Sequence, residues 1–299
     1  MVKLIRFLTI AIAIATVCGF LVIKIVPATY VRAAATVILS GGKTCSYQQI
    51  VEDEGVAHKT GQIRAGMLQR MRKMREDGAL QMWSTPQGDF WYVGAPTDLD
   101  AFVLAEEEID LYRAFRIPPG SIVLDCGANY GTFTRRALKQ GAAKVVAIEI
   151  NPEEQAALSR TFEKEIREGK VIVYGKGVWD KDAELDLRGD SVVLPNSGAP
   201  MRLPVTTIDH IVSELQLSSV DFIKMDIEGA EKNALRGAKT TLAKFSPLMA
   251  ISSEHLPDDM ESIPALVNDL VPGRYRMEYG RCFYVKPFHA PPNVLHFYR

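Results

Sequence analysis

The chain has 299 residues, 47% of them hydrophobic, which is enough to bury a full core in one α/β domain with extra elements or in two small domains. Its 35 basic and 36 acidic residues leave a net charge of -1, which argues against a sequence-independent nucleic-acid binder. The four cysteines are far apart and form no C-x-x-C pair (Cys18, Cys45, Cys126 and Cys282). We therefore expect no zinc site, redox pair or disulfide framework, which favours a reducing compartment.

Residues 7–23 form an uncharged apolar run that follows Lys3 and Arg6. The run is at the lower length limit for a transmembrane helix and somewhat longer than a usual signal-peptide core. We expect residues 1–30 to be a retained membrane anchor. A cleaved signal peptide is the main alternative, because small residues follow at 26–28 and 33–35, and a buried helix of a soluble domain is the third.

Residues 46–118 are predicted to be an accessory region of helices and a hairpin. Helical periodicity runs over 61–77, where Met67, Met71 and Met74 fall near one face. The apolar runs 80–83 and 90–93 flank a turn-rich segment and predict a β-hairpin. An amphipathic helix is expected over 100–115.

Residues 119–299 are predicted to form one α/β domain, because short apolar strands alternate with amphipathic helices. Strands are expected at 121–126, 144–150, 171–174, 221–227 and 248–252, and helices at 129–140, 152–168, 207–215 and 230–244. This alternation predicts a parallel sheet covered on both faces. Two final strands, 274–285 and 294–298, surround a Pro-rich turn and suggest an antiparallel hairpin at one edge of the sheet.

The first of these strands ends in the loop Asp125-Cys126-Gly127-Ala128-Asn129-Tyr130-Gly131. Ligands bind at the carboxyl ends of strands in such sheets, and Gly127 and Gly131 allow sharp turns and a close approach of the backbone to a ligand. No G-x-G-x-x-G sequence occurs in the chain, which disfavours a nicotinamide dinucleotide and an oxidoreductase. Asp125 would repel a pyrophosphate but can accept a hydrogen bond from an ammonium group. Cys126 is expected to be a small buried apolar residue.

Acidic and aromatic residues follow the next two strands. Glu149 closes the second strand, where a carboxylate can accept both hydroxyls of a ribose; a surface acid is the alternative. Val178 and Trp179 follow the third strand, at the side of the sheet where an adenine would lie. Trp179 is equally compatible with a place in the core.

The fourth strand carries charged residues at alternate positions, Lys224, Asp226 and Glu228. A strand that is buried on both faces is normally apolar, so this pattern indicates polar chemistry at its carboxyl end. A buried ion pair of Lys224 with Asp226 or Glu228 is the alternative.

These segments together resemble the FkbM-type methyltransferases, from about residue 101 to 256. The resemblance lies in the loop at 123–131, in Ala147-Ile148-Glu149 with Pro152, in 205–209, and in the run from Phe222 to Glu231. It implies a class I methyltransferase fold, Rossmann-like, with a mostly parallel seven-stranded sheet that has an antiparallel edge hairpin. It also implies S-adenosylmethionine (SAM) as cofactor and O-methylation of a hydroxyl on a sugar or small metabolite.

The resemblance also implies roles for individual residues. SAM would be bound by residues at the ends of four strands (Asp125, Gly127, Ala128, Asn129, Gly131, Glu149, Val178, Trp179 and Asp226). Asp226 and Glu228 would lie beside the transferred methyl and the acceptor. His255, which follows the fifth strand, is the candidate general base, with an ordinary loop histidine as the alternative. No metal site is expected, since Asp226 with Glu254 is only a weak signal for a divalent ion.

Two further expectations concern partners and location. The partner is a small-molecule or glycan hydroxyl acceptor, not nucleic acid, and residues 7–23 contact a membrane; the sequence does not predict an oligomeric state. Because SAM is a cytosolic metabolite, an anchored enzyme needs its catalytic domain in the cytoplasm. A membrane-anchored binding or scaffold protein that keeps the fold without turnover is the alternative function.

Overall fold

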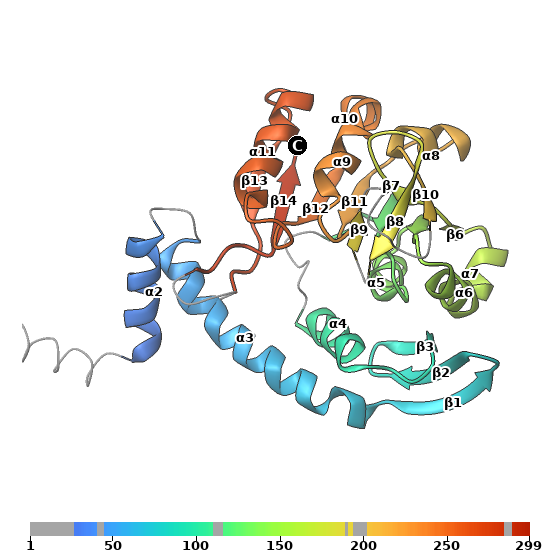
Figure 1. Cartoon of the computed structure of the whole chain (residues 1–299), viewed down its shortest axis with the longest axis horizontal. Helices are drawn as coiled ribbons and strands as arrows, with labels where there is room; N and C mark the ends of the chain where they lie inside the picture. Colours follow the sequence, from blue (N-terminus) through green and yellow to red (C-terminus); the bar gives the residue numbers. More distant parts are fainter. Residues whose placement is uncertain (1–26, 41–44, 110–115, 189–190, 194–201, 284–288) are drawn as a thin grey trace, which may run out of the picture. The chain divides into compact units, whose positions relative to one another are not determined.

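The computed structural model describes residues 27–40, 45–109, 116–188, 191–193, 202–283 and 289–299 (Figure 1). The chain divides into two compact units. The first comprises residues up to 57 together with 282–291, and the second comprises 58–281 and 292–299. Helix α3 (Tyr47–Met67) contributes its beginning to the first unit and its end to the second.

The first unit contains α2 (Ala28–Leu39), the start of α3 and a disulfide between Cys45 and Cys282. The expectation of no disulfide was therefore wrong. The two cysteines are 237 residues apart, so their spacing in the sequence carried no signal and only folding brings them together. The expected reducing compartment loses its support, because disulfides persist mainly in oxidising compartments. Cys126, in contrast, is a buried free thiol as expected.

The predicted apolar segment 7–23 lies outside the described residues. Within the described part of the chain, no helix combines the length and apolar character that crossing a bilayer requires.

In the second unit, the end of α3 is followed by a three-stranded antiparallel sheet, ordered β1-β2-β3 (Arg72–Asp77, Leu80–Thr85 and Gly88–Val93). The β2–β3 hairpin confirms the prediction, but the helix expected over 61–77 ends at Met67 and is followed by a 3-10 turn, η1 (Leu68–Arg70). Met67 and Met71 are buried while Met74 is exposed, so the apparent methionine face is not continuous. Tertiary pairing of the charged strand β1 with β2 overrides its helical periodicity.

Helix α4 (Asp98–Glu108) follows this sheet and starts at a capping box, in which Thr97 and Asp100 exchange hydrogen bonds. It overlaps the helix expected over 100–115 and starts two residues earlier. Residues 110–115 of the predicted helix lie outside the described residues.

The central sheet has seven strands in the order β13-β14-β12-β11-β4-β5-β6. Five are parallel, and β14 and β13 continue the sheet in antiparallel fashion beyond β12. This confirms the mostly parallel sheet and its edge hairpin. The strands span Ile122–Cys126 (β4), Lys144–Ile148 (β5), Val171–Tyr174 (β6), Phe222–Met225 (β11), Leu248–Ser252 (β12), Arg276–Tyr279 (β13) and Val294–Tyr298 (β14).

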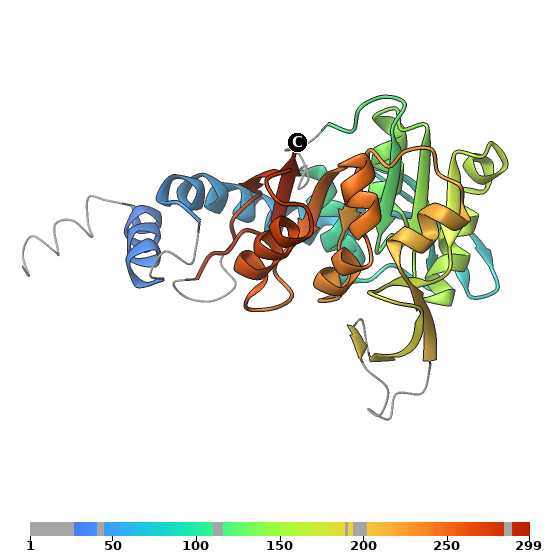
Figure 2. The same cartoon turned by 90° about the horizontal axis from the view of Figure 1, so that it is seen from above.

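Helices cover both faces of this sheet (Figure 2). Because successive strand residues point to opposite sides, each strand contributes side chains to both layers of the core. Leu124 and Val146 join a core with α8 (Ile208–Glu214), α10 (Lys239–Phe245) and α11 (Asp259–Leu270). Ala147 and Val171 pack on the other face against Leu158 of α6. The remaining helices are α5 (Thr132–Lys139), α6 (Pro152–Thr161), α7 (Glu163–Arg167) and α9 (Glu231–Arg236). Helix α11 was not predicted, and the single helices expected over 152–168 and 230–244 are each divided in two.

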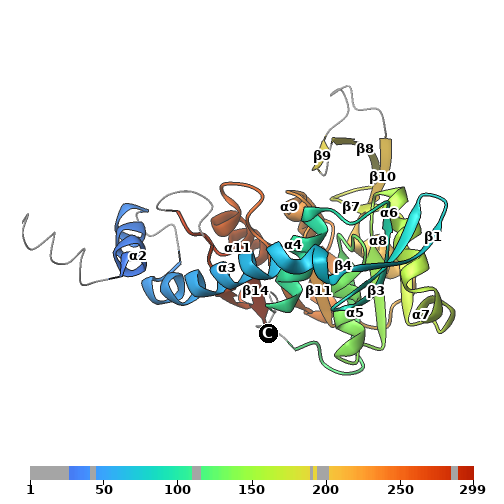
Figure 3. The same ribbon diagram turned by 90° about the horizontal axis from the view of Figure 1, so that it is seen from below.

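A four-stranded sheet ordered β7-β10-β8-β9 was also not predicted. Its strands are β7 (Gly177–Val178), β8 (Ala183–Arg188), β9 (Ser191–Val193) and β10 (Arg202–Thr206). β8 and β9 extend away from the central sheet (Figure 3). β7 pairs with β10 in parallel, which fixes the segment after β6 beside the carboxyl ends of the central strands.

Candidate functional site

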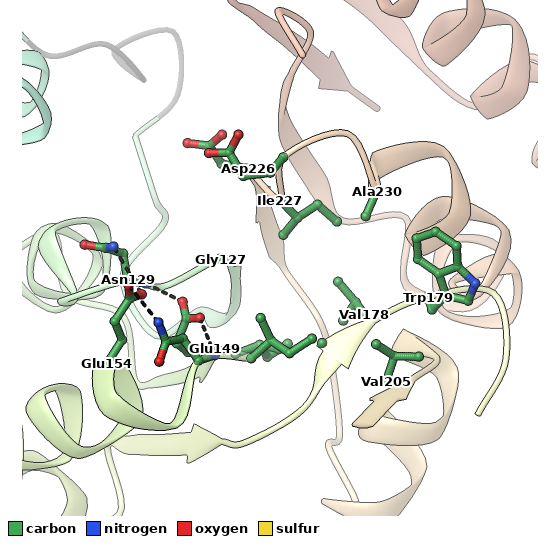
Figure 4. Close-up of a pocket in the computed structure, with 15 residues that line it drawn as sticks. Gly127, Asn129, Glu149, Glu154, Val178, Trp179, Val205, Asp226, Ile227 and Ala230 are labelled. Carbon is green, nitrogen blue, oxygen red and sulfur yellow. Dashed lines mark hydrogen bonds between the residues drawn. The ribbon is translucent and has the colours of Figure 1, made fainter. Parts of the chain in front are cut away.

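A cavity of about 140 Å³ opens at the carboxyl ends of β4, β5 and β11. Its apolar lining comes from several loops (Ile148, Ile150, Val178, Val205, Ile227 and Ala230), and its polar lining includes Asn129, Glu149, Asn151, Glu154, Asp226 and Glu228. Glu149 lies on one side, and Asp226, Ile227 and Ala230 lie on the opposite side (Figure 4). Trp179 also lines this first cavity. An apolar slot with a carboxylate on one wall suits a flat base attached to a ribose.

Glu149 is held by the loops around it. Its Oε2 accepts the backbone N–H of Asn129 at 2.8 Å, and its Oε1 accepts the N–H of Asn151 at 2.9 Å (Figure 4). Burial raises the pKa of Glu149, and the two backbone donors offset part of this rise. Each oxygen keeps lone-pair capacity, so the preformed carboxylate can also accept ribose hydroxyls.

We expect Glu149→Ala to weaken SAM binding by about 10- to 100-fold, because the ribose hydroxyls would lose a charged acceptor whose hydrogen bonds contribute roughly 1.5–3 kcal/mol. Isothermal titration calorimetry of the full chain measures the effect. Glu153→Ala is the matched control, since Glu153 is an exposed acid on the same loop–helix segment. Equal SAM affinity in both variants would contradict the assignment of Glu149 to the SAM site.

Gly127 and Gly131 make the sharp turns that the sequence predicted, and they also allow close packing between loops. Both have positive φ, and a Cβ on Gly127 would lie 1.9 Å from the backbone oxygen of Asp226. A Cβ on Gly131 would lie 2.2 Å from the ring of Phe162. The glycines therefore allow the β4 loop to pack closely against the β11 loop and against the segment after α6. Gly127 lines the first cavity, whereas Gly131 is not among the residues that line it.

Asp125 is fully buried and is not among the residues that line the cavity. Its Oδ2 accepts the Thr134 hydroxyl at 2.6 Å, and its Oδ1 lies 3.5 Å from Nζ of Lys224. Lys224 also donates to the backbone oxygen of Gly127 at 2.7 Å and lies 3.9 Å from Asp226. The structure therefore does not place Asp125 where it could contact a ligand ammonium directly, as the sequence had predicted. Asp125 acts on the site through Lys224, which ties the β4 loop to β11.

His255 lies between acidic residues. Its Nδ1 is 2.9 Å from the buried Glu231, and its Nε2 is 3.5 Å from both Asp226 and Glu228. Burial lowers the pKa of His255, but the hydrogen bond with Glu231 and the nearby carboxylates outweigh it and raise the pKa to about 9. The imidazole is therefore mainly protonated at neutral pH and holds Asp226 and Glu228 by charge.

A second cavity of about 250 Å³ adjoins the first and shares Gly127, Asn129, Glu154, Asp226 and Glu228 with it. Ala128 lines this second cavity, as do Glu106 of α4 and Lys224. Most of the predicted site residues thus come together at the two cavities. Asp125, Gly131 and His255 are not among the lining residues and lie behind them.

Sequence reasoning missed several residues of this site: Asn151, Glu154, Glu231 and the acidic face of α4. Asn151 caps α6 by accepting the N–H of Glu153, and the Asn-Pro pair at this helix start was the signal that could have found it. Glu231 is the last residue of the run from Phe222 that carries the family resemblance, but its pairing with His255 can be seen only in the folded structure. No motif marked α4.

Comparisons with known proteins identify the family of this chain. A sequence model described as the methyltransferase FkbM domain matches residues 125–275, half of the chain. The 2-O-methyltransferase NoeI of Sinorhizobium fredii (strain NBRC 101917 / NGR234) is 31% identical over 149 residues. The match covers 42% of this chain and 60% of NoeI, so the chain spans less than two thirds of this relative's length.

Solved structures show more distant similarity. The crystal structure of methyltransferase FkbM from Methylobacillus flagellatus KT is 19% identical with a TM-score of 0.45, covering 83% of this chain and 61% of that one. A SAM-dependent methyltransferase from Aquifex aeolicus is 17% identical with a TM-score of 0.35, covering 64% of this chain and 87% of that one.

Proposed function

Since the chain belongs to the FkbM family of SAM-dependent methyltransferases, we propose that it methylates a hydroxyl oxygen on a sugar or small metabolite. This proposal rests mainly on the two adjoining cavities, which share Asp226 and Glu228. The first cavity suits the adenosine part of SAM, and the second leaves room for an acceptor. The similarity to a protein described as a 2-O-methyltransferase supports oxygen as the methylated atom.

The residues present fit SAM, which supplies a methyl group on a positively charged sulfur. Glu149 would hold the ribose, while Val178, Val205 and Ile227 would pack the base. The remaining task of the protein is to align the acceptor with the methyl, because alignment supplies much of the rate in such transfers.

Asp226 is the proposed acceptor of the hydroxyl proton, because it lines both cavities and only a third of its side chain is exposed. The role predicted for His255 as general base remains a prediction, but a group with a pKa of about 9 holds its proton at neutral pH. We therefore propose that His255, oriented by Glu231, positions Asp226 and Glu228.

The test is incubation of the full chain with isotope-labelled SAM and a panel of sugars and hydroxylated metabolites. We expect label in a methyl ether, identified by NMR of the product, and strongly reduced transfer with Asp226→Asn. Label on nitrogen or carbon would contradict O-methylation. Absence of SAM binding to well-folded protein would instead support a scaffold that keeps the fold without turnover.

We expect the His255 imidazole to titrate at about pH 9 in NMR spectra, and Glu231→Gln to shift this pKa downward. Because the folded-state pKa exceeds the ordinary 6.5, protonation of His255 stabilises the fold fully below about pH 6.5. This contribution is lost as the pH rises through about 9. Urea unfolding at pH 6 and pH 9.5 should therefore show a smaller loss of stability in His255→Asn than in the wild type, and identical losses would contradict the assignment.

The location of the domain is a separate proposal. We propose that residues 7–23 anchor the chain to a membrane and that the domain faces the cytosolic SAM pool. The Cys45–Cys282 disulfide weighs toward the alternative of export with a cleaved signal. Alkylation of acid-quenched cells distinguishes the two: free thiols at these cysteines support the cytoplasm, and an intact disulfide supports export.

A further inference from the structure

Helix α2 of the first unit exposes apolar side chains on the face that a surface helix of a soluble domain normally makes polar. Its inner face includes Ala33 and Thr36, which are buried. On the outside, Ile38 and Leu39 are 76% and 66% exposed. Arg32 is the one charged residue of the helix, so α2 has no strongly polar face toward water. Exposed apolar surface of this kind marks a site of contact with a protein or a membrane.

The length of α2 limits how it can meet a membrane. Its 12 residues extend about 18 Å at roughly 1.5 Å per residue, whereas the hydrocarbon core of a bilayer is about 30 Å thick. The helix is therefore too short to span the bilayer. Since its inner face already packs within the first unit, only its outer face is left for lipid, which fits a helix that lies in the plane of the interface.

The position of α2 in the sequence points to the same kind of partner. The uncharged apolar run at 7–23 precedes it, and residues 24–27 alone separate the run from the first residue of the helix. If that run is the anchor proposed above, the chain leaves the bilayer where α2 begins. The exposed apolar side chains are then held at the membrane surface, so lipid is the partner with the highest local concentration.

The charge of this part of the chain is complementary to anionic lipid. Glu52 is the first acidic residue of the sequence, and five basic residues precede it although the whole chain has a net charge of -1 (Lys3, Arg6, Lys24, Arg32 and Lys43). Basic residues beside an apolar segment attract anionic head groups. Arg32 lies 3.8 Å from Glu54 of α3 and its side chain is 46% exposed, so its charged end can also reach the head-group region while its stem stays on apolar surface.

We propose that the outer face of α2 lies on an anionic membrane surface, parallel to its plane, with Ile38 and Leu39 in contact with the acyl chains. Tyr30 and Tyr47 are exposed nearby in the sequence and fit the head-group region, where tyrosine is enriched. This inference rests on the proposed anchoring by residues 7–23 and adds a second attachment to it. It concerns attachment and not methyl transfer, so the two can fail separately.

Quenching of one added tryptophan by lipid tests this in the full chain, reconstituted into vesicles of phosphatidylcholine and phosphatidylglycerol with brominated acyl chains. Ile38→Trp places the probe on the outer face of α2, where the exposed position tolerates the larger side chain. Glu52→Trp is the matched control, because Glu52 is exposed on α3 in the same unit. The emission of the three native tryptophans is measured in the wild type and subtracted. We expect Ile38→Trp to be blue-shifted and quenched, most strongly by bromines close to the head groups, and Glu52→Trp to be unquenched.

The other outcomes each contradict a stated part of the proposal. Strongest quenching by bromines at the ends of the acyl chains would place α2 inside the hydrocarbon core and overturn the in-plane position. Flotation of the chain with the vesicles but no quenching of Ile38→Trp would overturn the contact of α2 and leave the anchor standing, whereas no flotation would overturn both. A blue shift without quenching would show that protein covers this face, and a dependence of the shift on chain concentration would identify a second copy. Equal quenching in phosphatidylcholine alone would overturn the contribution of the basic residues.

Discussion

Asp125→Ala is expected to lower the free energy of unfolding by about 3–5 kcal/mol, because it leaves the Lys224 ammonium buried without its main counter-ion. Asp125 is 0% exposed and Lys224 is 5% exposed, so water cannot replace the lost partner. SAM binding should also weaken, since Lys224 donates to the Gly127 carbonyl in the ligand loop. Urea unfolding followed by tryptophan fluorescence gives the stability.

A double-mutant cycle separates the ion pair from its surroundings. Lys224→Met alone should destabilise the protein comparably, whereas Asp125→Ala with Lys224→Met should cost clearly less than the sum. Thr134→Val is the control, because it removes only the neutral hydroxyl that Asp125 accepts and should cost about 1 kcal/mol. Strict additivity of the two charge changes would show that the pair does not act as a unit.

Gly127→Ala is expected to abolish detectable SAM binding and to destabilise the protein by more than about 2 kcal/mol. The new Cβ would lie 1.9 Å from the Asp226 backbone oxygen, so the β4 loop and the β11 loop must separate. The residue also has φ of +78°, which adds roughly 1–2 kcal/mol of backbone strain for alanine. Calorimetry and thermal unfolding measure the two effects.

Gly120→Ala isolates the steric part of this effect. Gly120 has a similar positive φ of +84°, but a Cβ there meets no atom within 4 Å. It should cost only the backbone strain and leave SAM binding intact. Comparable SAM binding by Gly127→Ala and Gly120→Ala would show that the close approach to Asp226 is not needed for the site.

The central sheet was predictable from the sequence because its signals are local. Each buried parallel strand is a short apolar run, and helical periodicity separates one strand from the next. The ligand loop, Glu149 and the acidic end of β11 were placed correctly at one edge of the sheet, since the carboxyl ends of parallel strands lie together. The helix predicted over 61–77 was wrong for its last part, 72–77, because pairing of β1 with β2 depends on a partner strand that periodicity does not include.

The sequence by itself determined the fold class, the cofactor and part of the cavity lining, because each depends on residues close together in the chain. Only the tertiary structure decided which side chains pair with one another and, through burial and these pairings, the charge states of the site residues. It paired Asp125 with Lys224, His255 with Glu231, and Cys45 with Cys282 across 237 residues. It also brought Glu106 of α4 to the cavity. These pairings depend on burial and on distances in space, which the spacing of residues along the chain does not encode.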